Sequence, residues 1–281
     1  MSAIIMHANE IAKAGKETLK TIIKSYNLTP KLAIISVGYD PASKTYINGK
    51  KKDCKEIGIE CDIYHPEPSS DEIIKCIHQL NNDQSVTGIL VQLPLPKNIN
   101  KELIMREIDP SKDVDCFHPL NVATLFQSDP LLAPCTPGGI IHLLKMYDIS
   151  IPGKNCVVIG RSDIVGKPMA TLLTHKDATV TLCHSKTKDI SMYTKNADII
   201  ISAVGKPKFI TADMVNENAV VIDVGINRDE NGKLCGDVDF EEVSKKCYAI
   251  TPVPGGVGLM TRLQLLENIV DFAIYQEDVH I

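Results

Sequence analysis

Short apolar runs alternate with amphipathic segments along the whole chain of 281 residues. In the first half, strand-like runs occupy residues 31–38, 60–65 and 87–96, and segments with helical spacing occupy residues 8–25, 43–57, 71–82 and 100–107. In the second half, β-branched runs occupy residues 155–160, 178–185, 197–205, 219–225 and 247–253. This alternation predicts an α/β protein with parallel sheets, whose second-half strands are apolar enough to be covered on both faces.

A proline-rich segment at residues 128–139 marks a predicted boundary between two parts of the chain. It leads into a helix for which Thr136 is the expected N-cap and Pro137 the expected first residue. A last amphipathic helix is expected over residues 260–274, and a terminal helix of this kind could return to the first domain.

Composition indicates an ordinary soluble globular protein, with 44% hydrophobic residues, 23% charged residues and a formal net charge of −5. This charge gives no reason to expect a nucleic-acid or membrane-surface partner, and no apolar run approaches the roughly 18 residues of a membrane span. The N-terminus lacks the pattern of a secretory signal. Nine cysteines are spread singly without a Cys-x-x-Cys pair, which argues against a zinc site or a disulfide framework. We therefore expect a protein of the reducing cytoplasm.

Lys50 stands where the helical pattern of residues 43–57 calls for an apolar residue. Ile47, Cys54 and Ile57 form the rest of the stripe, and Tyr46 lies one turn before Lys50. Turning an ammonium inward costs several kcal/mol unless it is paired or loses its proton, and a neutral amine can act as a general base. The alternative is a lysine that extends to the surface. Tyr46 and the nucleotide-binding pattern downstream favour the functional interpretation.

Three further polar residues of the first half are candidates for a site. Gln92 interrupts an apolar strand near its carboxyl end, where parallel sheets bind ligands, although it could equally bond a neighbouring loop. Asp115 lies in a loop beside Asp113, and paired carboxylates in loops are more often turn-formers. His118 could be a base, a capping residue or a core histidine.

The segment "VVIGRSDIVGKPM" follows a predicted strand and opens a helix, as a dinucleotide-binding loop does. Gly160 supplies the tight turn, Ser162 replaces the second glycine of the usual fingerprint, and Gly166 comes one place late. Ser162 still permits close backbone approach, its hydroxyl could donate to a phosphate, and the helix N-terminus favours an anion. The alternative is an ordinary glycine-containing turn.

The next strand ends without the carboxylate that NAD-preferring folds use to accept from the ribose hydroxyl. It ends instead in His184, Ser185 and Lys186, and Arg161 lies in the preceding loop. These donors and positive charges favour the 2′-phosphate of NADP, unless Lys186 is only a solvated turn residue.

Taken together, these motifs resemble the bifunctional methylenetetrahydrofolate dehydrogenase/methenyltetrahydrofolate cyclohydrolase family (FolD type) over essentially the whole chain. The motifs follow in the family's order: "TYINGKKKDCKEIGI", "GILVQLPLP", "KDVDCFHPLN", "PCTPGGI", "VVIGRSDIVGKPM", "ATVTLCHSKT", "ADIIISAVGKP", "VIDVGIN", "GDVDF" and "TPVPGGVG". The resemblance implies NADP-dependent oxidation of 5,10-methylenetetrahydrofolate and hydrolysis of the methenyl product to 10-formyltetrahydrofolate. It also implies a homodimer and no metal.

The resemblance further implies roles for particular residues. Lys50 would be the acid/base of hydrolysis, Tyr46 would position the pterin and Gln92 would bond near the lysine. Asp115 would hold the amino-pyrimidine edge of the pterin, and Pro254 and Gly255 would line the folate site. The cofactor would be bound by Gly160, Arg161, Ser162, Ile164, Val165, Gly166, His184, Ser185, Thr187, Ala203, Val204, Gly205, Gly225, Ile226 and Asn227.

The same resemblance implies two domains with the active-site cleft between them. Residues 1–136 and 259–281 would form a folate-binding catalytic domain, and residues 137–258 a Rossmann-type NADP-binding domain.

Three positions depart from the family pattern. Cys116 and Ala123 replace glycines, and Leu259 replaces a proline. If the glycine is needed for positive φ, Cys116 carries strain of about 1 kcal/mol or more. A close rival interpretation is therefore a dehydrogenase with weakened cyclohydrolase activity. Two more distant interpretations are an amino-acid or shikimate-type NADP dehydrogenase and a non-enzymatic NADPH sensor.

Overall fold

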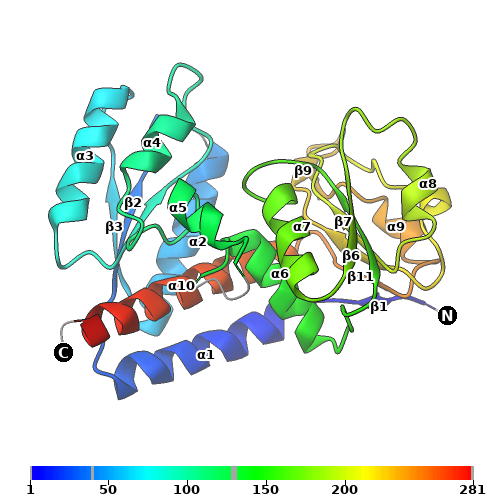
Figure 1. Ribbon diagram of the computed structural model, residues 1–281, viewed down its shortest axis with the longest axis horizontal. Coiled ribbons are helices and arrows are strands. Elements are labelled where there is room, and N and C mark those ends of the chain that lie inside the picture. Colours follow the sequence, from blue (N-terminus) through cyan, green and yellow to red (C-terminus); the bar gives the residue numbers. More distant parts are fainter. Residues whose placement is uncertain (1, 39–40, 128–131, 280–281) are drawn as a thin grey trace. The chain divides into compact units, whose positions relative to one another are not determined.

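The computed structural model describes residues 2–38, 41–127 and 132–279 and divides the chain into two compact units (Figure 1). The six-stranded unit consists of Met1–Ala12 and Thr136–Thr261, and the three-stranded unit consists of Lys13–Cys135 and Arg262–Ile281. Each unit is thus built from two separate stretches of chain. Helices α1 (Asn9–Ser25), α6 (Cys135–Met146) and α10 (Val257–Val279) contain the points where the chain passes from one unit to the other.

The three-stranded unit is a parallel sheet in the order β3-β2-β4, formed by β2 (Lys31–Ile35), β3 (Glu60–Tyr64) and β4 (Gly88–Val91). Its remaining helices are α2 (Pro41–Ile57), α3 (Ser70–Asn82), α4 (Lys101–Glu107) and α5 (Pro119–Thr124). Ile35, Ile73, Ile77 and Ile89 are fully buried in its core. The apolar strands and the apolar faces of α3 and α4 therefore pack as the sequence pattern predicts.

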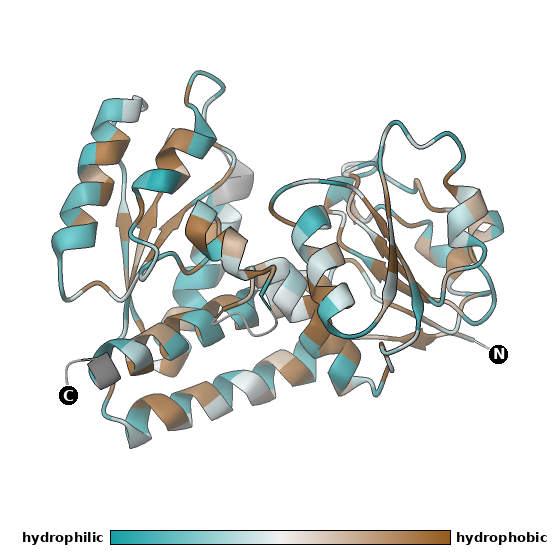
Figure 2. Cartoon of the chain, in the orientation of Figure 1, coloured by the Kyte–Doolittle hydropathy of each residue, from teal (hydrophilic) through white to brown (hydrophobic). Residues whose placement is uncertain are grey.

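The six-stranded unit is a parallel sheet in the order β1-β11-β8-β7-β5-β6. Its strands are β1 (Ile4–Ile5), β5 (Asn155–Ile159), β6 (Thr179–Cys183), β7 (Ile199–Ser202), β8 (Val220–Asp223) and β11 (Ala249–Ile250). The unit also contains α7 (Gly166–His175), α8 (Ser191–Thr194), η1 (Ala212–Met214), α9 (Phe240–Val243) and the short antiparallel pair β9 (Asn227–Arg228) and β10 (Leu234–Cys235). Figure 2 shows hydrophobic colouring along the strands of this sheet, as expected for strands covered on both faces.

The predicted α/β class with parallel sheets is confirmed. The elements absent from the sequence-based prediction are β1, α5, α8, η1, α9, β9 and β10, which contain two to six residues each. Such short elements contain too few residues to show a hydrophobic period. Part of the predicted boundary segment, residues 128–131, lies outside the described residues.

Two local expectations differ from the structure. Helix α6 begins at Cys135, so Thr136 lies inside the first turn, where its hydroxyl bonds that of Thr261 at 3.1 Å; its prediction as N-cap is wrong. Residues 2–12, expected with the folate-binding domain, belong to the six-stranded unit because Ile4 and Ile5 pair with Ala249 and Ile250.

Lys112 is a buried lysine with a structural task. Its Nζ donates to the carbonyl oxygens of Leu80, Asn81 and Asp83 at 3.1, 2.9 and 2.7 Å, at the end of α3. Replacing Lys112 with methionine should lower the free energy of unfolding by about 2–3 kcal/mol, because these buried acceptors lose a charged donor. Urea denaturation would measure the difference in free energy of unfolding between this variant and the wild type. Replacing exposed Lys75 with methionine is the control, with an expected change within about 0.5 kcal/mol; equal effects of both variants would contradict the assignment.

Candidate functional site

Lys50 and Gln92 meet at the carboxyl edge of the three-stranded sheet. Lys50 Nζ donates to Gln92 Oε1 at 3.1 Å, and Gln92 Nε2 donates to the Leu93 carbonyl at 2.8 Å. The second bond fixes the amide so that its oxygen faces the ammonium. The Gln92 backbone also extends the ladder, since its N–H donates to the Ile35 carbonyl at 2.9 Å. A strand end and a helix thus hold the two side chains together.

The surroundings of Lys50 agree only partly with the expected inward orientation. Ile47, Cys54 and Ile57 are buried, which confirms the apolar stripe of α2. Lys50 itself is half-buried, and Tyr46 is 37% exposed. Lys50 therefore neither enters the core nor extends freely into solvent, but is held at the rim of the stripe by Gln92.

The loop after α4 gives each of three polar residues a defined partner. The buried Asp113 carboxylate accepts from the backbone N–H of His118 at 2.7 Å and from Asn121 Nδ2 at 3.0 Å, so Asp113 is a turn-former. His118 is a capping residue, because its Nδ1 accepts from the Leu120 N–H at the start of α5 at 3.1 Å. Asp115 is half-buried, and its Oδ1 accepts from the Cys135 thiol at 3.3 Å.

The Cys135 thiol connects the surroundings of Asp115 and Lys50. Burial raises the pKa of this thiol well above its ordinary value, and the Asp115 carboxylate raises it further, whereas the charge of Lys50 acts in the opposite direction. Cys135 thus remains a protonated donor toward Asp115. Sequence reasoning missed Cys135, although it lies in the quoted "PCTPGGI" motif.

Cys116 occupies the left-handed backbone region directly after Asp115, with φ of 59°. Its side chain is 1% exposed and packs beside Asn268, whose amide donates to the carbonyls of Val114 and Ala133 at 2.8 and 2.9 Å. The expected positive φ is therefore present, and a non-glycine residue adopts it at an energetic cost. Ala123 is exposed on α5, and Leu259 lies in the first turn of α10.

A matched pair of substitutions measures the strain at Cys116. Both Cys116→Gly and Cys116→Ala remove the sulfur, but only alanine keeps a Cβ at positive φ. Cys116→Gly should therefore be more stable than Cys116→Ala by about 1 kcal/mol. Thermal and denaturant unfolding would measure the difference, and an alanine variant at least as stable as the glycine variant would refute the strain.

The loop between β5 and α7 has the close backbone packing of a phosphate-binding turn. Gly160 has φ of 119°, and a Cβ on Gly166 would lie 2.0 Å from the Gly160 carbonyl oxygen. Ser162 Oγ accepts from the N–H groups of Val165 and Gly166 at 3.2 and 3.3 Å, which leaves its hydroxyl hydrogen free to donate. Arg161 and Ser162 are exposed, and Ile164 and Val165 are half-buried.

The sheet register brings the predicted cofactor residues to one edge. Parallel strands β6, β5, β7 and β8 are neighbours, so the segments after Cys183, Ile159, Ser202 and Asp223 follow adjacent strand ends. The chain turns from β6 on one side of β5 to β7 on the other, which makes this edge a topological switch point. The segments concerned contain Gly160 to Gly166, His184 to Thr187, Ala203 to Gly205, and Gly225 to Asn227.

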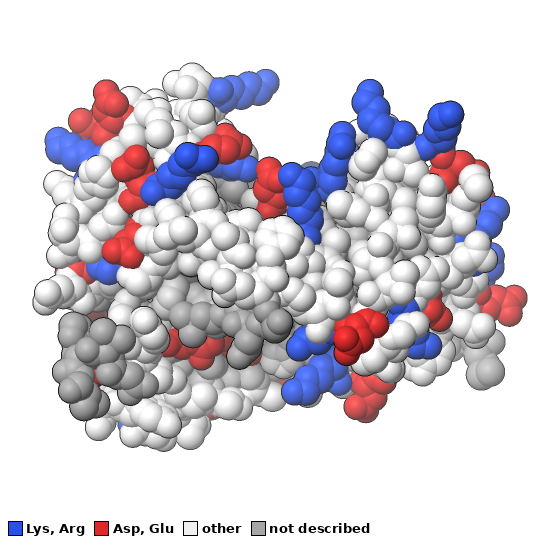
Figure 3. Space-filling model, in the orientation of Figure 1, with Lys and Arg blue, Asp and Glu red and all other residues white. Residues whose placement is uncertain are grey.

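Beyond β6, the turn is ordered by its own hydrogen bonds. The His184 N–H donates to Thr187 Oγ1 at 2.9 Å, and His184 Nδ1 accepts from the Lys186 N–H at 3.2 Å. Ser185 and Lys186 are exposed. Figure 3 shows several Lys and Arg side chains along the upper rim of the six-stranded unit.

Two buried carboxylates that sequence reasoning missed organise the other loops of this edge. Asp237 accepts from the N–H groups of Val204, Gly205 and Lys206 at 2.7, 3.2 and 2.9 Å, and from Asn227 Nδ2 at 2.9 Å. Asp223 accepts from the N–H groups of Gly225, Asp237 and Val238. Burial raises the pKa of the Asp223 carboxyl to about 6. The available signal was an aspartate ending an apolar strand in "VIDVG" and another in "GDVDF".

Pro254 and Gly255 belong to the six-stranded unit. Pro254 is exposed, and Gly255 has φ of 105° and accepts from the Ala8 N–H through its carbonyl at 2.8 Å. The structure thus places the predicted folate residues in both units: Tyr46, Lys50, Gln92 and Asp115 in one, and Pro254 and Gly255 in the other.

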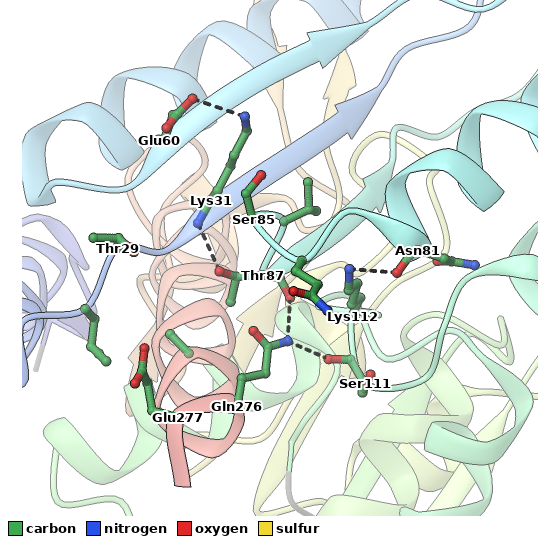
Figure 4. A pocket seen from close by; sticks show the side chains of 14 residues that line it. Thr29, Lys31, Glu60, Asn81, Ser85, Thr87, Ser111, Lys112, Gln276 and Glu277 are labelled. Carbon is green, nitrogen blue, oxygen red and sulfur yellow. Dashed lines mark hydrogen bonds and ion pairs between the residues drawn. The ribbon is translucent and has the colours of Figure 1, made fainter. Parts of the chain in front are cut away.

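A separate polar cavity of about 440 Å³ lies at the amino ends of the strands of the three-stranded unit (Figure 4). Its cations already have partners: Lys31 pairs with Glu60 at 3.2 Å, and Lys112 binds three carbonyls. Gln276 bridges the carbonyls of Thr87 and Ser111 at 3.3 and 3.4 Å. The cavity lies at the sheet edge opposite to Gln92, so we do not include it in the site.

Among the helices formed by residues 2–38, 41–127 and 132–279, none combines the length and the apolar composition of a membrane-spanning segment. All nine cysteines are free thiols.

Comparison with known proteins covers nearly the whole chain. Residues 6–115 match the family model described as "Tetrahydrofolate dehydrogenase/cyclohydrolase, catalytic domain", and residues 134–277 match "Tetrahydrofolate dehydrogenase/cyclohydrolase, NAD(P)-binding domain". The Bifunctional protein FolD of Acetivibrio thermocellus is 53% identical over 281 residues, with 98% of this chain and 99% of that protein covered.

Two solved structures are similar along their full length. The bifunctional FolD enzyme of Campylobacter jejuni is 50% identical, with a TM-score of 0.94 and with 98% of this chain and 99% of that chain covered. The FolD of Trypanosoma brucei, solved with NADP cofactor and an inhibitor, is 34% identical, with a TM-score of 0.94 and 100% of both chains covered. These matches do not favour a shikimate-type dehydrogenase, a sensor or a dehydrogenase-only enzyme. The chain is an enzyme that belongs to the tetrahydrofolate dehydrogenase/cyclohydrolase family.

Proposed function

We propose that this enzyme oxidises 5,10-methylenetetrahydrofolate with NADP+ and hydrolyses the methenyl product to 10-formyltetrahydrofolate. The observation that carries the proposal is the Lys50–Gln92 hydrogen bond of 3.1 Å at the carboxyl edge of the three-stranded sheet, in a chain of this family. Lys50 is thereby oriented by a neutral partner instead of a carboxylate.

The residues of the six-stranded unit fit NADP. The turn from Gly160 to Gly166 is closely packed through its backbone, and the hydroxyl of Ser162 and the N-terminus of α7 supply donors for an anion. The turn of residues 184–187 after β6 contains no carboxylate to compete with a 2′-phosphate, whereas Arg161, His184 and Lys186 supply donors and positive charge. When bound, NADP+ accepts the hydride of the oxidation. A direct comparison of the affinities for NADP+ and NAD+ tests the expected preference.

Hydrolysis depends on proton transfer by Lys50. The methenyl carbon is a cationic electrophile, and the water that attacks it must lose a proton. A neutral Lys50 amine accepts that proton and returns it to the ring nitrogen as its bond to the carbon breaks. The hydroxyl left on the carbon then loses its own proton to solvent as the formyl carbonyl forms. Tyr46 would position the pterin, and Asp115 would accept hydrogen bonds from its amino-pyrimidine edge. The Cys135 thiol, which donates to Asp115 Oδ1, leaves the other carboxylate oxygen for the substrate.

We also propose that the enzyme is cytoplasmic and homodimeric. Nine free thiols suit a reducing compartment, and the homodimer follows from the family resemblance. Sedimentation equilibrium at micromolar concentration would test the dimer, and a monomeric mass would refute it.

A single assay tests the proposed function. NADPH formation is followed at neutral pH with methylenetetrahydrofolate and NADP+, and the mixture is then acidified to convert 10-formyl product back to the methenyl form. NADPH without free methenyl compound before acidification means that both reactions occur. Persistent methenyl compound would leave only the dehydrogenase and implicate Cys116. Absence of NADPH, and of NADH with NAD+, would refute the proposal.

A further inference from the structure

Helix α2 contains a glycine where a helix is least tolerant of one. Gly49 lies in the interior of α2, directly before Lys50, where glycine costs about 1 kcal/mol relative to alanine. A Cβ at this position would lie 2.3 Å from Nη1 of Arg262. The missing side chain therefore makes room for the guanidinium of Arg262.

The same guanidinium forms an ion pair with a buried carboxylate of α2. Arg262 Nε lies 3.0 Å from Asp53 Oδ2, and Lys16 Nζ lies 3.4 Å from Asp53 Oδ1. Asp53 is 4% exposed, and these two cations compensate its buried charge. Arg262 thus holds α2 by a contact at Gly49 and by an ion pair one turn later at Asp53.

The contacts of Arg262 with α2 lie next to Tyr46 and Lys50, the two residues of this helix assigned to the folate site. Gly49 and Asp53 are four residues apart and share one stripe of α2, and Tyr46 and Lys50 share the neighbouring stripe. Burial raises the pKa of the Tyr46 phenol, and the charge of Arg262 acts in the opposite direction. Rotation of α2 about its axis would move Tyr46 and Lys50 together.

We propose that Arg262 is a positioning residue for hydrolysis. It fixes the rotation of α2 through Gly49 and Asp53, and so holds Lys50 Nζ against Gln92 Oε1. This inference rests on the proposed function, in which Lys50 transfers the proton. A lysine nitrogen lies far from the helix axis, so a small rotation displaces it more than the backbone, and a displacement of about 1 Å costs on the order of 100-fold in rate.

Two variants test the inference independently. Arg262→Met removes the ion pair, and Gly49→Ala displaces the guanidinium while favouring the helix, so it remains folded. Both should lower kcat for hydrolysis of methenyltetrahydrofolate about 10- to 100-fold, and leave KM for NADP+ in the dehydrogenase reaction within twofold. A purely structural role would lower stability without lowering kcat of the folded enzyme.

Lys16→Met is the matched control, because it removes the other cation of Asp53 and leaves Gly49 and Arg262 in place. Its kcat for hydrolysis should stay within twofold of the wild-type value. If the wild-type enzyme hydrolyses methenyltetrahydrofolate and both Arg262→Met and Gly49→Ala keep the wild-type kcat, this inference is overturned while the proposed function stands. Equal losses in all three variants would overturn it as well, since the contact at Gly49 would then not matter. A wild-type enzyme without hydrolysis would overturn this inference together with the proposed function.

Discussion

Replacing Lys50 with methionine should lower hydrolysis of methenyltetrahydrofolate by about 100- to 10,000-fold, the contribution of a positioned general acid or base. Methionine keeps the length and much of the volume of the side chain but cannot accept a proton. The oxidation needs no proton from Lys50, so NADPH formation should continue and free methenyl compound should accumulate. Continuous absorbance at neutral pH would follow both products.

The neighbouring residue supplies the control for this substitution. Lys51 is exposed on α2, so Lys51→Met removes the same charge without touching Gln92 and should hydrolyse normally. Unchanged hydrolysis in Lys50→Met would show that another group moves the proton. A parallel loss of both activities in Lys50→Met would mean that Lys50 binds the folate and does not act only in the hydrolytic step.

Replacing Gly166 with alanine should weaken NADP+ binding by about 100-fold, which corresponds to about 2.7 kcal/mol. The added Cβ would meet the Gly160 carbonyl oxygen at 2.0 Å and the Arg161 Cα at 3.0 Å. Both are backbone atoms, so no side-chain rotation relieves the clash, and the turn that carries Ser162 must shift. Isothermal titration with NADP+ would measure the change in Kd.

Gly153→Ala separates this clash from a general cost of adding a side chain. Gly153 lies in the same unit at φ of 73°, and a Cβ there would have no atom within 4 Å. This variant should lose stability through backbone strain and still bind NADP+ with nearly wild-type affinity. Equal affinities of the two variants would show that the tight Gly160–Gly166 contact is not part of the binding site.

The sequence predicted those features that depend on residues close together in the chain, such as hydrophobic periods and short motifs. Apolar runs located the main strands, and the interrupted stripe of α2 drew attention to Lys50, which the structure joins to Gln92. The turn of Gly160 to Gly166 could be identified because its glycines and serine are close in sequence. Local spacing was sufficient in each of these cases.

The remaining features depend on contacts between distant segments. Cys135 reaches Asp115 across 20 residues, Asp237 holds the loop of Val204 from 33 residues away, and Arg262 reaches Asp53 from the other end of the chain. No local period encodes such pairs. The N-cap expected at Thr136 failed for a related reason, since its hydroxyl bonds Thr261.

The pairing of β1 with β11 has a consequence for dissecting this enzyme. A fragment that begins at residue 137 would lack β1 and would leave one edge of β11 without its hydrogen-bonding partner. A fragment that ends at residue 136 would lack the part of α10 that carries Asn268, whose amide supports the carbonyls of Val114 and Ala133. Neither half can therefore be cut out as one uninterrupted piece of polypeptide. A chain in which a linker joins residue 12 directly to residue 136, and which ends at residue 261, would keep both stretches of the nucleotide-binding half.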